Sequence, residues 1–237
     1  MIGLVVVSHS RALARAAVDL ATELLPRQPV RVRIAAGLDE ATLGTDAVAV
    51  ADAIAAADTG DGVLVLMDLG SALLSAETAL DLLDTPHIVR LCAAPLVEGL
   101  VAALAAAGGG ADLEKVAGEA DRALDAKRAQ LGETVAPLPD SAEPDSTMDS
   151  AVVAVFQVRN EHGLHARPAA ELVAGLRDLD VVVTLRNATT DVGPVPGESL
   201  TRVLTLGVMP GQQLEVTASG PDAQTALARI EALTTGH

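Results

Sequence analysis

Aromatic residues are almost missing from this sequence, whose 237 residues include one Phe, no Tyr and no Trp. Proteins that bind single-stranded nucleic acid stack its bases on aromatic side chains, so that mode of binding has no support here. The chain also has only 16 Lys and Arg against 32 Asp and Glu, which gives a formal charge of −16 and disfavours contact with phosphate backbones. We therefore expect no nucleic-acid partner.

Cysteine and long apolar runs are also scarce. The single cysteine, Cys92, has no partner for an internal disulfide, which fits a reducing compartment. The apolar stretch at residues 91–110 is interrupted by Pro95, Glu98 and three consecutive glycines, which disfavours a membrane span. The chain begins with an apolar segment and without a basic region or a cleavage site, so we expect no secretion signal and a cytoplasmic location.

What the sequence has in abundance is small aliphatic side chains. Half of the residues are hydrophobic, and Ala, Val and Leu supply nearly all of them. So much aliphatic surface has to be buried, which excludes disorder over the whole chain. Small side chains allow helices to pack closely on sheets, so an α/β or α+β protein is expected.

Apolar strands alternate with helical patterns over residues 1–131. Strands are expected at residues 2–7, 30–35, 62–67 and 88–92, and helices at residues 11–25, 45–57, 71–83, 96–107 and 113–131. This alternation predicts an α/β domain with a mainly parallel sheet and helices on both faces. Ligands of such sheets bind at the carboxyl ends of the strands.

Residues 132–150 interrupt this organisation. They contain three prolines and several Ser and Asp residues, and the last fifteen carry four acids and no base. A segment of this composition cannot bury enough surface to offset its ordering entropy, so we interpret it as a flexible acidic linker.

Residues 151–237 form a second predicted domain with a βαββαβα order. Strands are expected at residues 152–158, 181–186 and 213–218, with a weak one near 189–195, and helices at residues 166–176, 199–204 and 222–233. This order predicts an α+β open-faced sandwich, an antiparallel sheet with helices on one face. Pro194 and Pro196 cannot donate to a ladder, so the weak strand must lie at an edge or be mostly loop.

Two of the five histidines occupy similar places. His9 and His165 each stand between a predicted strand and a predicted helix, beside the unpaired amides of a helix start, where phosphate groups bind. A neutral imidazole is a good nucleophile near pH 7, which suits it to carry a phosphoryl group. Arg167, two residues after His165, is expected to hold the phosphoryl oxygens. The alternative for each histidine is a hydrogen-bonded structural residue.

A second loop of the first domain carries further candidates. Asp68 ends the strand at 62–67 and is expected to accept a hydrogen bond from one ring nitrogen of His9, which leaves the other nitrogen nucleophilic. Gly70 is expected to allow close approach of a phosphate, and Ser71 to offer it a hydroxyl. The alternative for Asp68 is a cap of the helix that follows.

Several other kinds of site lack support. Neither a P-loop nor a Gly-x-Gly-x-x-Gly motif after a strand is found, so nucleotide sites are not indicated. No metal site is expected, because His162 and His165 precede a helix rather than share one of its faces. A Ser-His-Asp hydrolase built on Ser8, His9 and Asp68 is disfavoured, because neighbours on an extended strand point to opposite faces.

Residues 151–237 resemble the histidine-containing phosphocarrier protein (HPr) of the phosphoenolpyruvate (PEP)-dependent phosphotransferase system. The resemblance is carried by Gly-Leu-His-Ala-Arg-Pro at 163–168, Glu-Ser-Leu at 198–200 and Leu-Thr-Leu-Gly-Val at 204–208. It implies that His165 takes the phosphoryl group and that Arg167 assists. It also makes Ser199 a candidate regulatory phosphorylation site, although Glu198 stands where a basic residue is expected.

Residues 1–131 resemble mannose-type enzyme IIA domains and, more closely, the phosphotransfer subunit of PEP-dependent dihydroxyacetone kinase. The matching segments are residues 5–10, 35–38, 68–79 and 89–99. The resemblance implies that His9 is the phosphorylated residue of this domain. It also implies a homodimer through the first domain.

Together the two resemblances imply a phosphotransferase that works as a relay. Enzyme I, charged by PEP, phosphorylates His165, and the group passes to His9 and then to ADP on the nucleotide-binding subunit of the kinase. That subunit then phosphorylates dihydroxyacetone on the dihydroxyacetone-binding subunit. Since this chain ends after the HPr-like domain, we expect a separate enzyme I. The chain itself needs no cofactor, because any magnesium comes with the partner's ADP.

Two alternatives remain open. In the first, His9 donates to an enzyme IIB of a mannose-family sugar transporter. In the second, the chain is a non-enzymatic sensor whose phosphorylation state is read by a transcription factor. Residues 70–79 disfavour the transport alternative, because the corresponding loop of the sugar-transport relatives is different.

Overall fold

A computed structural model of the chain describes residues 1–26, 29–133, 151–161 and 163–235. The chain divides into two compact units, Met1–Leu124 and Asp125–His237. Most of the predicted linker, residues 134–150, lies outside the described residues.

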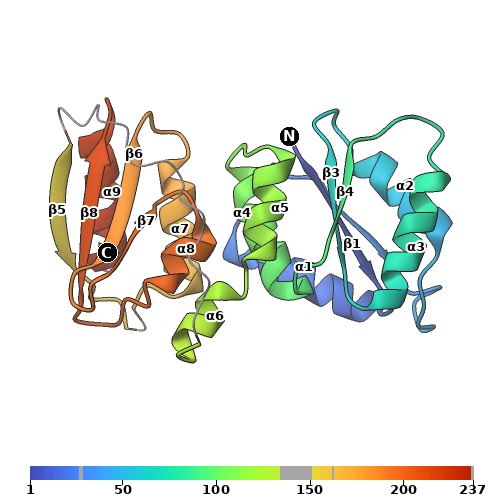
Figure 1. Ribbon diagram of the computed structural model, residues 1–237, viewed down its shortest axis with the longest axis horizontal. Coiled ribbons are helices and arrows are strands. Elements are labelled where there is room, and N and C mark those ends of the chain that lie inside the picture. Colours follow the sequence, from blue (N-terminus) through green and yellow to red (C-terminus); the bar gives the residue numbers. More distant parts are fainter. Residues whose placement is uncertain (27–28, 134–150, 162, 236–237) are drawn as a thin grey trace. The chain divides into compact units, whose positions relative to one another are not determined.

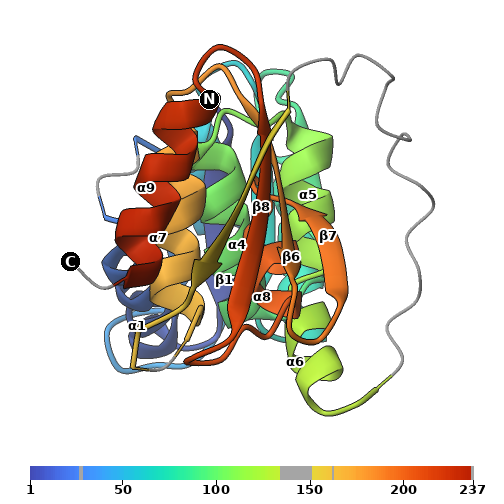
Figure 2. The same cartoon turned by 90° about the vertical axis from the view of Figure 1, so that its left-hand side faces the viewer.

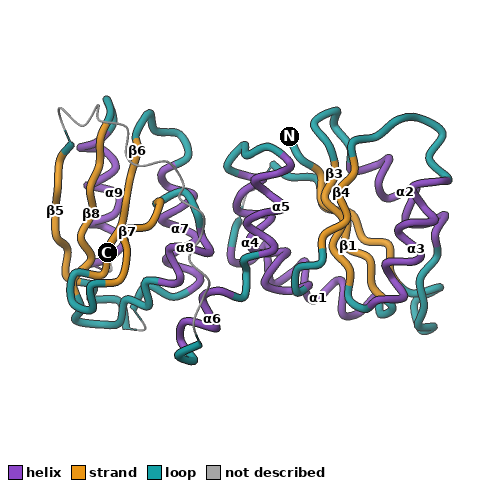
Figure 3. Tube along the Cα trace, viewed as in Figure 1, coloured by secondary structure: helices purple, strands orange, loops and turns teal. Residues whose placement is uncertain are grey.

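The first unit is built on a parallel sheet of four strands in the order β2-β1-β3-β4. The strands are β1 (Gly3–Ser8), β2 (Val32–Ala36), β3 (Val63–Met67) and β4 (Val89–Cys92). Leu4 of β1 is opposite Val32 on one side and Leu64 on the other. All six residues of β1 are buried, as expected for a central strand covered on both faces. Figure 3 separates these strands from the surrounding helices by colour.

Five helices cover this sheet in two layers (Figure 1). Helices α1 (Arg11–Leu24), α4 (Leu96–Gly108) and α5 (Leu113–Asp121) lie on one face, and α2 (Ala47–Ala57) and α3 (Gly70–Asp81) on the other. Beneath α2 and α3 the core joins Val5 and Val7 to alanines of both helices. Small side chains at these contacts allow the helices to approach the strands closely, as the composition predicts.

The prediction of one helix over residues 113–131 is wrong. Helix α5 ends at Asp121, and after a short turn a separate helix, α6 (Asp125–Gln130), begins. Neither glycine nor proline marks this break in the sequence, and alanines on both sides of it are buried. The boundary between the two compact units falls in the same turn, and α6 belongs to the second unit.

The second unit contains an antiparallel sheet in the order β5-β8-β6-β7, whose strands can be followed in Figure 2. The strands are β5 (Val152–Gln157), β6 (Val182–Asn187), β7 (Val192–Pro196) and β8 (Gln213–Ser219). Helices α7 (Ala166–Leu176), α8 (Leu200–Thr205) and α9 (Ala223–Thr235) pack on one face. Side chains of β8 therefore alternate between fully buried and partly exposed, which confirms the predicted open-faced sandwich.

The weak strand lies at the edge of this sheet. Among the described residues, β7 pairs only with β6, so Pro194 and Pro196 are tolerated where a central strand would need their missing N–H groups. None of the helices in the described parts of the chain is both long and apolar enough to cross a membrane.

Candidate functional site

His9 stands at the carboxyl end of the central strand of the first unit. Strand β1 ends at Ser8, and α1 begins after the cap residue Ser10, whose Oγ accepts a hydrogen bond from the backbone N–H of Leu13 (3.3 Å). The carbonyl oxygen of His9 accepts the N–H of Gly44 (2.9 Å), from the loop after β2. The backbone of His9 is therefore held between a strand, a helix cap and a neighbouring loop.

Asp68 holds the imidazole of His9 from the end of β3. Its Oδ2 accepts the backbone N–H of His9 (2.8 Å), and its Oδ1 lies 2.9 Å from the ring Nδ1. Burial raises the pKa of Asp68, but hydrogen bonds from His9, Ser8 and Leu69 outweigh it and hold the pKa below its ordinary value. The carboxylate is therefore ionised at neutral pH, so Nδ1 donates to it and the neutral ring keeps its lone pair on Nε2.

Ser71 completes the surroundings of the ring. Its Oγ lies 2.8 Å from Nε2 of His9, in the first turn of α3. With Nδ1 as a donor, Nε2 is the acceptor, and the hydroxyl of Ser71 donates to it. The side chain of His9 remains 24 % exposed, so an incoming group can reach the ring.

Gly70 precedes Ser71 at the start of α3. A Cβ added there would meet no other atom of the described structure within 4 Å. Packing of the chain therefore does not require glycine at this position, and the expectation that Gly70 allows close approach of a phosphate stays a prediction. The structure brings His9, Asp68, Gly70 and Ser71 together at the carboxyl edge of the sheet, as the order of strands and loops predicts.

Ser8 was not expected to take part in this cluster. Its Oγ donates to Oδ2 of Asp68 (2.8 Å), so Ser8 and His9 both contact the same carboxylate. The prediction that these neighbours point to opposite faces is wrong, because β1 ends at Ser8 and the chain bends at His9. Ser8 nevertheless contacts Asp68 rather than the ring, so it does not form the excluded hydrolase arrangement.

His165 of the second unit stands in a comparable place. It is exposed and is the N-cap residue of α7, with an extended backbone and no capping bond from its own side chain. The preceding loop is fixed by a hydrogen bond from Leu164 N–H to Val208 O (2.8 Å). Gly163 has φ +73°, and a Cβ there would lie 2.3 Å from the same Val208 oxygen, so this close approach requires glycine.

A shallow hollow of about 460 Å³ borders His165. Arg159, Asn160, Pro168 and Glu171 are among its lining residues, together with the last turn of α9. Arg159 was not predicted as a site residue, because it precedes the Gly-Leu-His-Ala-Arg-Pro motif at residues 163–168 and is not part of it. The backbone N–H of Arg159 donates to Thr234 O (2.8 Å), which ties the start of the loop to α9.

Arg167 and Ser199 are placed differently from each other. Arg167 is exposed in the first turn of α7, two residues after His165. Ser199 is only 5 % exposed, and its Oγ accepts the N–H of Arg202 (3.3 Å) as the N-cap of α8. The structure therefore gives Ser199 a capping role, whereas Arg167, like His165, is exposed at the start of α7.

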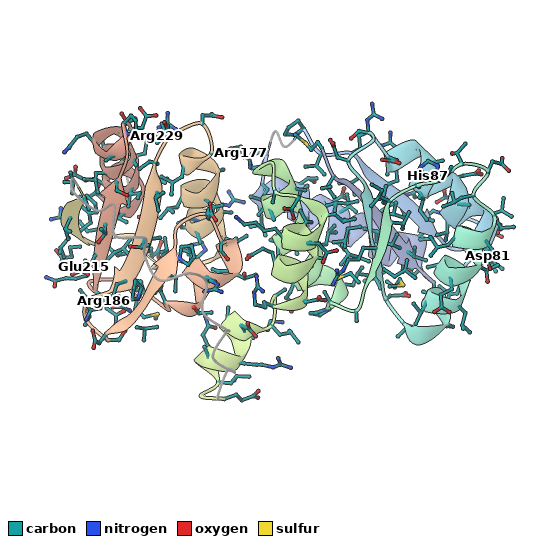
Figure 4. The ribbon with its side chains drawn as sticks, turned by 45° about the horizontal axis from the view of Figure 1, so that its top comes forward. Asp81, His87, Arg177, Arg186, Glu215 and Arg229 are labelled. Carbon is teal, nitrogen blue, oxygen red and sulfur yellow. The ribbon has the colours of Figure 1, made fainter. Side chains whose placement is uncertain are left out.

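A second imidazole–carboxylate pair lies at the opposite edge of the first sheet. His87, labelled in Figure 4, precedes β4, and its Nδ1 is 2.6 Å from Oδ2 of Asp58. Its Nε2 is 3.0 Å from Oγ1 of Thr85. The His87 side chain is 15 % exposed. This pair connects the loops that follow α2 and α3, away from the cluster around His9.

Within the described ranges, no three or more His, Cys, Asp or Glu side chains gather as a metal site would require. Cys92 is buried and donates to Asp121 Oδ1 (3.3 Å), and burial raises the pKa of its thiol to about 11. That thiol is therefore neutral at physiological pH and a poor nucleophile.

Two models of known protein families match this chain, one in each of its two parts. A family model described as "PTS system fructose IIA component" (EIIA-man) matches residues 3–117. A second model, described as "PTS HPr component phosphorylation site", matches residues 152–235. His9 and His165 thus each fall inside one of the two matched segments.

Curated relatives match both halves together. A protein of Pantoea ananatis named "PEP-dependent dihydroxyacetone kinase, phosphoryl donor subunit DhaM" is 47 % identical over 98 % of this chain and 50 % of the relative. The Escherichia coli protein of the same name is 43 % identical over 96 % of this chain and 48 % of its own length. A multiphosphoryl transfer protein of Salmonella typhimurium is 40 % identical over 47 % of this chain and 28 % of its own length. The chain thus spans about half the length of the DhaM relatives.

Proposed function

Because the EIIA-man model matches residues 3–117, the PTS-HPr model matches residues 152–235, and DhaM relatives match almost the whole chain, we propose that it acts as a phosphoryl donor subunit of a PEP-dependent dihydroxyacetone kinase. The observation that carries the proposal is the cluster around His9. Asp68 accepts a hydrogen bond from Nδ1 of His9, which leaves the lone pair on Nε2, and the His9 side chain is 24 % exposed.

The relay begins at His165. In the proposal enzyme I, charged by PEP, transfers its phosphoryl group to His165, which is exposed at the start of α7. The first amides of α7, together with the charge of Arg167 in the first turn of this helix, favour a dianionic group there. Arg159 lines the hollow beside the ring and adds a second guanidinium.

The second step transfers the group from His165 to His9. Nε2 of His9 attacks phosphorus as the N–P bond to His165 breaks, so one N–P bond replaces another and no proton is released. Because the two bonds are alike, the step is nearly balanced in energy, and positioning provides most of the rate. Asp68 keeps the ring in the reactive tautomer and stabilises the positive charge that develops on it.

Ser71 has a defined place in this step. When a phosphoryl group occupies Nε2, the hydroxyl of Ser71 can no longer donate to that nitrogen. It then donates to a phosphoryl oxygen beside the first amides of α3. From His9 the group passes to ADP on the nucleotide-binding subunit of the kinase, which then phosphorylates dihydroxyacetone on the dihydroxyacetone-binding subunit.

The test counts acid-labile phosphates on the intact chain. With enzyme I and PEP, the relay gives two phosphates on the wild-type chain, one on His9→Ala and none on His165→Ala. Phosphorylation of His9 in the His165→Ala variant would refute the order of transfer. Incubating the charged chain with the ADP-loaded kinase subunit then gives ATP, whereas absence of ATP favours donation to a sugar transporter.

A further inference from the structure

The cluster around His9 contains an unbroken chain from a hydroxyl through an imidazole to a carboxylate. Ser71 Oγ is 2.8 Å from Nε2 of His9, and Nδ1 of His9 is 2.9 Å from Oδ1 of Asp68. Serine hydrolases activate their nucleophile with groups connected in this order and at these distances. The hydrolase arrangement with Ser8 as the serine was disfavoured in the sequence, and in the structure Ser71, not Ser8, contacts the imidazole.

Each member of the chain is in the state that nucleophilic chemistry needs. Asp68 is ionised, because its hydrogen bonds outweigh the effect of burial. It therefore fixes the tautomer in which Nε2 of His9 accepts a proton. Ser71 is exposed, so an electrophile can reach its Oγ without rearrangement of the chain.

The surroundings of Ser71 also provide donors for a developing negative charge. It lies in the first turn of α3, a helix of twelve residues. The first amides of a helix have no acceptor within it and carry a partial positive charge. Here the N–H of Leu69 is taken by Asp68 (2.7 Å) and that of Ala72 by Leu69 O (2.9 Å). The amides of Gly70 and Ser71 lie between these two in the first turn of α3 and are the donors that we assign to an oxyanion formed at Ser71.

We propose that Ser71 is an activated nucleophile toward activated acyl and phosphonyl electrophiles, a second chemistry of the cluster that carries His9. With a fluorophosphonate, Ser71 Oγ bonds to phosphorus, the P–F bond breaks, and fluoride leaves. The hydroxyl proton passes to Nε2 of His9 and then to water. With an activated ester, the same attack forms an acyl-serine and releases the alcohol, and water with His9 as base removes the acyl group.

The two chemistries of the cluster exclude one another. A phosphoryl group on Nε2 removes the base that Ser71 needs, so a charged His9 leaves the serine unreactive. Ser71 does not capture that phosphoryl group itself, because in-line displacement requires a nucleophile opposite the leaving nitrogen, whereas its Oγ lies on the same side as the bonded phosphorus. Reactivity of Ser71 therefore reports whether His9 is free.

The experiment treats the full chain with a fluorophosphonate probe and locates the adduct by mass spectrometry. One adduct is expected, on Ser71, and Ser71→Ala should abolish it. His9→Ala and Asp68→Asn should slow labelling by on the order of 10³-fold, since each removes a member of the relay. Prior charging with enzyme I and PEP should protect Ser71.

Ser75 supplies the matched control. It lies one turn further along α3, and its Oγ contacts Thr45 Oγ1 (2.7 Å) rather than an imidazole. In the Ser75→Ala variant, the probe should still react with Ser71, and at the wild-type rate. Labelling elsewhere, no labelling, or labelling of Ser71 that His9→Ala leaves unchanged would each overturn the proposal. A thermal melt of each variant separates loss of fold from loss of the relay.

The probe requires neither enzyme I nor PEP, so this test is independent of the proposed relay. A chain that labels on Ser71 but never accepts a phosphoryl group supports the nucleophile and refutes the relay. A chain that is charged on His9 but never labelled gives the opposite result.

Discussion

Asp68 binds His9 at two points, with Oδ2 on the backbone N–H and Oδ1 on the ring Nδ1, at 2.8 and 2.9 Å. The contact to the backbone fixes where the residue stands, and the contact to the ring fixes which nitrogen is free. One carboxylate therefore sets both the position and the tautomer of the imidazole that we propose as phosphoryl carrier.

Asp68→Asn should impair the proposed phosphorylation of His9 selectively. The amide keeps the shape of the side chain but lacks the charge that fixes the Nδ1 proton, so the rate of transfer to His9 should fall by about 10²-fold or more. Stopped reactions with enzyme I and PEP, followed by intact mass, measure this rate. Asp58→Asn, which alters the other His–Asp pair of the unit, is the matched control and should transfer normally. Equal loss in both variants would contradict a specific role for Asp68.

Asp58 should make the stability of the first unit dependent on pH in the acid range. The hydrogen bond from His87, followed by that from Gly60, holds the pKa of Asp58 below its ordinary value. A carboxyl whose folded pKa is depressed adds stability above its unfolded pKa of about 4, and this stability is lost as the pH falls through the folded value. Urea unfolding between pH 5 and 2 should therefore show a smaller loss of stability in Asp58→Asn than in wild type. If the free energy of unfolding fell equally with pH in wild type and in Asp58→Asn, this role of Asp58 would be contradicted.

Gly163→Ala should disturb the loop that carries His165. A Cβ at this position would lie 2.3 Å from Val208 O, and φ +73° is costly for alanine, so the second unit should lose about 1–3 kcal/mol. The loop must also move, which should slow charging of His165. Denaturant unfolding and charging kinetics measure the two effects. Gly175→Ala, where an added Cβ would meet no other described atom within 4 Å, is the control, and equal behaviour of the two variants would contradict the requirement for glycine.

Arg159→Gln should slow the proposed charging of His165 by about 10-fold, since it removes one charge-assisted contact to the phosphoryl group. The measurement is the rate of phosphate incorporation at limiting enzyme I. Arg186→Gln is the control, because Arg186 pairs with Glu215 on the sheet of the same unit (3.6 Å; Figure 4). A normal rate in Arg159→Gln would place that guanidinium outside the reaction.

Local sequence patterns predict most of the fold. The continuous apolar run at β1 and the alternating pattern of β8 differ because one strand is covered on both faces and the other on one. The break between α5 and α6 could not be seen, because the apolar pattern continues through it without glycine or proline. Helix ends without such markers depend on packing that the sequence does not display.

The residues of the candidate site that directly follow a strand were predictable from the sequence. The positions of His9 and Asp68 after neighbouring parallel strands predict their contact. The contact between Ser71 and Nε2 was not predicted, because it depends on the rotation of α3 about its axis. The prediction that the side chains of Ser8 and His9 point to opposite faces was wrong, because alternation along a strand no longer holds where the strand ends.

The burial of Ser199 has a consequence for any enzyme that modifies it. Its hydroxyl caps α8, a helix of only six residues, and is withdrawn from the surface. A modifying enzyme can act only on molecules in which this turn has opened, so the modification rate is limited by the opening equilibrium and not by the sequence around the serine. Amide hydrogen exchange at Arg202 would then measure, without any kinase, how often this chain exposes Ser199.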